Sequence, residues 1–123
     1  MYTKTYLDHF SNPRNVGALE NPAAKAEVVN MEGGCFDTAT LYVNYDGSTV
    51  SEARYQLKAC SGTIMAFSLL STRMEGRTLP EIKEIDFDTL LTDLGDLPEK
   101  KHHSLRLAIE AKDKIVQILE ENK

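Results

Sequence analysis

Five side chains in three short segments are of the types that bind transition metals. They are Cys35, Asp37, Cys60, His102 and His103. Two thiolates, an imidazole and a carboxylate suit zinc or an iron–sulfur cluster, and they suit magnesium or calcium poorly. A cysteine taken alone is more often a small buried apolar residue than a ligand. The spacing between the two cysteines matches no compact zinc-finger pattern, so spacing by itself leaves open that these residues are unrelated.

All three segments lie where one expected element gives way to another. Gly33 and Gly34 precede Cys35 and would let backbone amides approach its sulfur closely. Cys60 lies between an expected strand and an expected helix, and the partial positive charge of a helix N-terminus favours a thiolate. Residues 102–104 lie where a loop enters the last helix. Such boundaries can present ligands without loss of backbone pairing, so the sequence predicts that they carry any metal site.

Alternating apolar residues predict a β-hairpin in the middle of the chain. Residues 41–45 and 53–59 alternate between apolar and polar side chains on either side of Asp46-Gly47, a pair that forms tight turns. A first strand is expected over residues 26–31, and Cys60 follows the third strand.

Helices are expected over residues 4–10, 79–84 and 87–94, and over residues 64–74, where Ser61-Gly62-Thr63 offers caps and Gly76 an end. A last helix is expected to begin near Ser104. The last helix carries an apolar stripe that we expect to be buried: Leu105, Ala108, Ala111, Ile115 and Ile118. Three strands followed by several helices predict an α+β fold, with a three-stranded antiparallel sheet, helices packed on one face and a long C-terminal helix. No linker or repeat divides the sequence, so one domain is expected over residues 1–123.

Composition excludes several classes of function. The chain has 123 residues and a formal net charge of −5, which argues against binding to nucleic acid or to anionic lipid. No segment approaches the roughly 20 apolar residues of a membrane span, and the N-terminus lacks a secretory signal. Two cysteines do not define a disulfide framework. We therefore expect a cytoplasmic protein with no nucleic-acid or membrane partner.

The sequence resembles the U-type iron–sulfur scaffold family, which comprises IscU, SufU and the N-terminal part of NifU, over almost its whole length. The resemblance rests on four segments: Asp8-His9-Phe10 with Asn12-Pro13-Arg14-Asn15-Val16-Gly17, then Cys35-Phe36-Asp37, then Glu52-Ala53-Arg54-Tyr55 leading to Cys60, and finally Leu97-Pro98-Glu99-Lys100-Lys101-His102-His103-Ser104. The opening segment and the order of the ligand segments make the match specific. Within the opening segment, His9 is read as a structural or surface histidine. Arg14 is read as a surface arginine, with contact to a partner as its alternative.

The resemblance implies a function in cluster assembly. Such scaffolds receive sulfur from a cysteine desulfurase, combine it with iron and pass a nascent cluster, typically two-iron and two-sulfide, to recipient apoproteins. It implies that Cys35, Asp37, Cys60 and His103 bind the cluster, with His102 as a further metal ligand. It also implies a chain that holds and transfers rather than an enzyme, as a monomer or a homodimer.

The sequence departs from the family pattern at several positions. His103 stands where the family has its third cysteine, and an imidazole cannot carry a persulfide, although it can bind iron and raise the reduction potential of a cluster. Phe36 and Ala59 replace glycines beside the two cysteines. Glu99 interrupts the segment through which the family's heat-shock chaperones recognise their scaffold. Cluster binding is therefore expected to survive more readily than ordinary sulfur delivery.

Three other functions remain open from the sequence. Two thiolates with His103 and Asp37 would close a tetrahedral zinc site, as in a zinc protein that regulates or partners the sulfur machinery. The fold could also serve as an interaction module without metal. A hydrolase with a Cys–His pair is the least favoured, because no sequence feature specifies a substrate.

Overall fold

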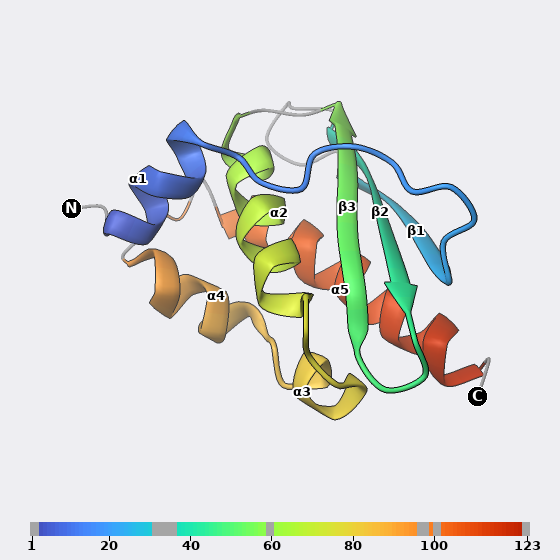
Figure 1. Ribbon diagram of the computed structural model, residues 1–123. Coiled ribbons are helices and arrows are strands. Elements are labelled where there is room, and N and C mark those ends of the chain that lie inside the picture. The colour runs from blue at the N-terminus through green and yellow to red at the C-terminus, as the bar shows by residue number, and fades with distance from the viewer. Residues whose placement is uncertain (1–2, 31–36, 59–60, 96–98, 100–101, 122–123) are drawn as a thin grey trace.

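The fold is a three-stranded antiparallel sheet with helices on one of its faces. The computed structural model describes residues 3–30, 37–58, 61–95, 99 and 102–121. Strands β1 (Ala24–Asn30), β2 (Asp37–Tyr45) and β3 (Val50–Lys58) are hydrogen-bonded in that order. In Figure 1 the helices lie together on one side of the three strands. The predicted α+β fold class is confirmed.

Five helices form the second layer, with α2 at its centre. They are α1 (Lys4–Ser11), α2 (Ser61–Met74), α3 (Leu79–Lys83), α4 (Phe87–Leu94) and α5 (His102–Glu121). Helix α2 is apolar around most of its circumference, and from Phe67 to Ser71 every residue is buried. A helix of this kind must be covered on all sides, and α2 accordingly packs against α1, α4, α5 and β3.

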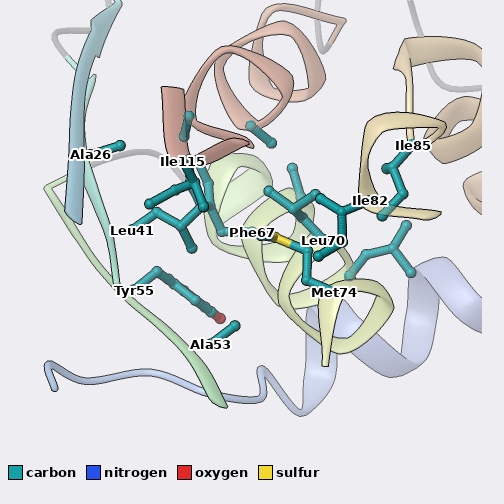
Figure 2. Packing of buried hydrophobic residues seen from close by; sticks show 14 of the residues in the cluster. Ala26, Leu41, Ala53, Tyr55, Phe67, Leu70, Met74, Ile82, Ile85 and Ile115 are labelled. Carbon is teal, nitrogen blue, oxygen red and sulfur yellow. The ribbon is translucent and has the colours of Figure 1, made fainter. Parts of the chain in front are cut away.

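One hydrophobic core joins the two layers (Figure 2). Leu41 and Tyr55 from the sheet face Phe67 of α2 and Ile115 of α5. The Tyr55 and Phe67 rings lie 5.8 Å apart between centroids. Of the stripe predicted on the last helix, Leu105, Ala108, Ala111 and Ile115 are buried, whereas Ile118 is only partly so and Leu119 takes its place in the core.

Local sequence signals define most element ends. Thr3 caps α1, Thr78 and Glu81 form a capping box on α3, and Asp86 caps α4. In the hairpin turn, Asp46 accepts hydrogen bonds from the amides of Ser48 and Thr49. These contacts explain why the hairpin and the short helices were predicted closely from sequence.

The segment Asn15–Gly17 covers the outer edge of β3. The Tyr55 amide donates to the Asn15 carbonyl, and the Gly17 amide donates to the Tyr55 carbonyl, at 3.1 and 2.8 Å. Both Tyr55 groups therefore point away from β2. The neighbouring outward groups of Ala53 are also engaged, since its amide donates to Glu75 and its carbonyl accepts from Arg54. Much of this strand edge is thus occupied by the chain itself.

The described part of the chain contains no helix both long and apolar enough to cross a membrane.

Candidate functional site

One end of the sheet collects residues that flank two of the predicted ligand segments. Strand β2 begins at Asp37, which pairs with Asn30 at the end of β1, and Thr38 pairs with Lys58 at the end of β3. Figure 1 shows these strand ends, and the start of α2, at the upper end of the sheet. Cys35 and Cys60 lie outside the described residues, as does the side chain of Asp37. The described neighbours of the two cysteines are nevertheless paired across adjacent strands.

A buried hydrogen bond joins α2, which follows the second ligand segment, to α5, which contains the third. Helix α2 begins at Ser61, directly after Cys60, and α5 begins at His102. The hydroxyls of Thr63 and Ser104 lie 3.0 Å apart. Both residues are buried, with 0% and 3% of their surface exposed. The first turns of α2 and α5 are therefore in direct contact.

Both predicted histidine ligands lie in the first turn of α5 and are half-buried. The His102 ring meets the Phe87 ring of α4 edge to face, with centroids 5.3 Å apart and an interplanar angle of 72°. The Nε2 atom of His103 is shielded from solvent. The exposed amides of a helix N-terminus favour negative charge. An anionic thiolate–metal centre beside this turn would therefore be stabilised.

The described residues do not by themselves form a metal site. Among them, no three histidine, cysteine, aspartate or glutamate side chains lie close enough to hold a metal ion. The structure describes the backbone of Asp37, both histidines, and Lys58 and Ser61, which lie two residues before and one residue after Cys60. The four-ligand site itself therefore stays a prediction.

Sequence reasoning missed the link between Thr63 and Ser104. Ser61 to Thr63 were read as helix caps, and Ser104 as the start of the last helix. Helix α5 instead begins two residues earlier, at His102, and the Ser104 hydroxyl contacts Thr63 rather than the end of its own helix. A contact between residues 41 positions apart leaves no local pattern.

His9 and Arg14 hold the N-terminal helix against α2. His9 is buried, and its Nδ1 lies 2.7 Å from the Ser68 hydroxyl. The same hydroxyl accepts a hydrogen bond from the Arg14 amide, so it can donate its hydrogen to a neutral His9 ring. Burial, and then the nearby Arg14 guanidinium, lower the pKa of His9. His9 therefore has a structural role, as the sequence indicated.

Arg14 forms an ion pair in which one guanidinium nitrogen contacts both carboxylate oxygens of Asp8. Its Nη2 lies 2.9 and 2.8 Å from the two carboxylate oxygens of Asp8. The hydrogen bond from Arg14 is the main reason that the pKa of Asp8 is lowered. The reading of Arg14 as a surface residue is correct, because 40% of its side chain is accessible. Its ion-pair partner, Asp8, belongs to the same chain.

Comparison with known proteins places the chain among cluster-assembly proteins. The profile of the family described as "NifU-like N terminal domain" matches residues 1–122. An iron–sulfur cluster assembly scaffold protein, IscU 1, from Archaeoglobus fulgidus is 32% identical over 111 residues, which cover 90% of this chain and 71% of that protein. An IscU scaffold protein from Aquifex aeolicus is 29% identical over 109 residues, with 89% and 69% covered.

Solved structures show the same fold. The N-terminal part of a NifU-like protein from Brucella abortus superposes with a TM-score of 0.76 at 22% identity, covering 98% of this chain and 95% of that chain. A SufU scaffold from Fervidobacterium islandicum AW-1 gives 0.73 at 17% identity, covering 94% and 96%. The profile match over residues 1–122, together with the 32% identical relative, settles the family: the chain belongs to the NifU-like N-terminal domain family.

Proposed function

We propose that this chain is an iron–sulfur cluster assembly scaffold or carrier, which holds a labile cluster or iron for transfer to recipient proteins. One arrangement carries the proposal. The pairing of Thr38 with Lys58 and the hydrogen bond between the Thr63 and Ser104 hydroxyls join the described neighbours of Cys35, Cys60 and His103. Relatives at 29–32% identity are named as cluster assembly scaffolds.

The proposed ligands are Cys35, Asp37, Cys60 and His103, with His102 as a further imidazole. Thiolates and imidazole are ligands that iron in clusters accepts, and a carboxylate is a weaker ligand for such a site. A mixed set of this kind suits cargo that must be released. The cluster is the cargo of this chain, proposed to be two-iron and two-sulfide, and cluster release requires no turnover by the chain itself.

The histidine at position 103 restricts where sulfur can enter. A persulfide needs a cysteine sulfur, so a partner cysteine desulfurase would deliver sulfur to Cys35 or Cys60. Release of sulfur from its source is then the chemistry of the desulfurase. This chain would contribute ligands, their orientation and shielding from water.

Anaerobic reconstitution tests the proposal. Purified protein incubated with ferrous iron and sulfide should develop the visible absorption of a cluster, and the absorption should fall sharply in Cys35→Ala and Cys60→Ala. Asp37→Asn should weaken cluster retention, whereas Asp88→Asn, at an exposed position of α4, should not. A parent protein that stays colourless and binds no iron contradicts the proposal.

The same donor set supports mononuclear zinc as the alternative. Two thiolates, an imidazole and a carboxylate complete the tetrahedral shell of a closed zinc site. Metal analysis of protein isolated without added metal separates the two functions. One tightly held zinc per chain, unaffected by iron and sulfide, would favour a zinc protein that regulates or partners the sulfur machinery.

A further inference from the structure

Two polar side chains interrupt the apolar contact between α2 and α5. Thr63 and Ser104 are each the third residue of their helices, and each is followed by a fully or nearly fully buried apolar residue within two positions, Met65 and Leu105. The hydroxyls lie 3.0 Å apart in a region that solvent does not reach. A hydrogen bond is directional and holds its two oxygens within a narrow range of distances, so each of these two residues constrains where the other can lie.

A second contact holds the same turn of α5 from another helix. Phe87, the first residue of α4, packs edge to face on His102. The turn that contains His103 is therefore contacted at the residue before it by α4 and at the residue after it by α2. Helix ends fray readily because their first amides have no partner within the helix. Contacts on both flanking residues oppose this fraying where His103 is attached.

Stability alone does not require the hydroxyl pair. Replacement of both partners of a buried hydrogen bond by apolar groups of similar shape is often nearly neutral. An apolar pair could fill the same space, but it would allow the two helix ends to slide, because packing lacks the directionality of a hydrogen bond. What the hydroxyl pair adds is a fixed separation between the two first turns.

We propose that Thr63 is a positioning residue for the metal or cluster ligand His103. Through Ser104 it fixes the first turn of α5 against the first turn of α2, which directly follows Cys60. This inference deepens the proposed function and rests on it for the identity of the ligands. The mutual positioning of the two helix ends is a property of the metal-free chain and can be tested separately.

Amide hydrogen exchange tests the positioning without metal. Thr63→Val should speed exchange at Leu105 and Arg106, in the first turns of α5, although the substitution lies on α2. Thr63→Ser keeps the hydroxyl and should restore slow exchange. Thr72→Val is the matched control, because the Thr72 hydroxyl bonds only within its own helix in the described contacts, to the Leu69 carbonyl. It should leave Leu105 and Arg106 unchanged.

Cobalt(II) binding tests the consequence for the site. Thr63→Val with Ser104→Ala leaves neither hydroxyl unpaired, so its thermal midpoint should stay close to that of the parent. Cobalt absorption bands of this double variant should shift, and cobalt should pass to a chelator about tenfold faster, in the range found for residues that orient metal ligands. Thr63→Ser should again behave as the parent.

The outcomes separate this inference from the proposed function. Unchanged exchange in Thr63→Val overturns it, and so does faster exchange with unchanged cobalt spectra and release, because the pair would then be structural only. A parent chain that binds neither cobalt nor iron contradicts the proposed function. The exchange comparison then decides alone whether Thr63 positions the α5 turn.

Discussion

At the scale of single residues, some buried polar groups have hydrogen-bond partners within the described chain and others do not. Among the described residues, the Tyr55 hydroxyl is buried without a hydrogen-bond partner. Burial raises the pKa of Tyr55 to about 12. Ser68 lies near enough to moderate this rise, but its hydroxyl contacts His9 and the Arg14 amide instead. The hydroxyl of Tyr55 therefore adds little to stability.

We expect Tyr55→Phe to leave the free energy of unfolding unchanged or to raise it by up to about 1 kcal/mol, because a buried group without a partner is removed. Tyr42→Phe is the control, since the Tyr42 hydroxyl donates to Gln56 at 2.7 Å. That change should cost about 0.5–1.5 kcal/mol. Urea unfolding of both variants measures the difference, and a larger loss for Tyr55→Phe would show that its hydroxyl is bonded.

The lowered pKa of His9 predicts how stability depends on pH. Because the folded state disfavours the charged ring, the unfolded chain binds more protons below the ordinary His pKa of 6.5. Stability from His9 is therefore present above that pH and falls as the pH drops below it. Burial is the largest single cause of the lowered pKa; the charges of Arg14 and Arg73 lower the pKa of His9 further, whereas the charge of Asp8 raises it.

Urea midpoints at pH 7.5 and 5.5 should differ more for the parent than for His9→Gln, which carries no titratable group at this position. His102→Gln, on the half-buried turn of α5, is the comparison that shows whether the effect belongs to His9. Equal pH dependence in the parent and in His9→Gln would contradict this assignment.

At the scale of elements, Asn15 joins the N-terminal segment to both layers of the fold. Its backbone has a φ of 65°, in the left-handed region. Its side-chain amide donates to Ser71 and Glu75 at 3.0 and 3.2 Å, and its oxygen accepts from Arg54 at 3.1 Å. Asparagine suits both demands, because it tolerates positive φ and offers a donor and an acceptor.

Asn15→Gly and Asn15→Ala separate these two demands. Glycine keeps the backbone conformation and loses the side-chain bonds, at a cost of about 1–3 kcal/mol. Alanine loses the same bonds and also strains the left-handed backbone, which adds about 1–2 kcal/mol. Chemical denaturation of the two variants should therefore rank alanine as the less stable. Equal stability would mean that the backbone conformation relaxes at no cost.

Sequence alone predicted the elements whose signals are local. The Asp46-Gly47 turn and the alternation in residues 53–59 gave the hairpin, and the apolar residues of each helix gave the helices, within a few residues. The contacts of Asn15 with Tyr55 and of Thr63 with Ser104 link positions about 40 apart, and no periodicity reveals them. For the same reason, the sequence proposes the site only as a set of ligand types at element ends, and the ligand set itself stays a prediction.

At the scale of the whole molecule, bound metal should contribute directly to stability. A ligand that binds only the folded chain stabilises it in proportion to the logarithm of its concentration over Kd. Cobalt(II) at a hundred times its Kd should raise the free energy of unfolding by about 2.7 kcal/mol. Cys60→Ala should lose most of this increment. Measurement of unfolding with and without cobalt checks it, and an equal increment in Cys60→Ala would place the metal elsewhere.

The cover that Asn15–Gly17 forms on the outer edge of β3 also affects how readily the protein aggregates at high concentration. A bare strand edge is a template on which another chain can add a strand, and repeated addition leads to aggregates. The residues that close this edge are not part of the sheet and belong to the same segment that His9 anchors to α2. Loss of the contact between His9 and Ser68 would therefore loosen α1 and also expose the unpaired edge of β3 to other chains. The N-terminal segment that includes Asn15–Gly17 therefore protects the folded chain against aggregation through β3.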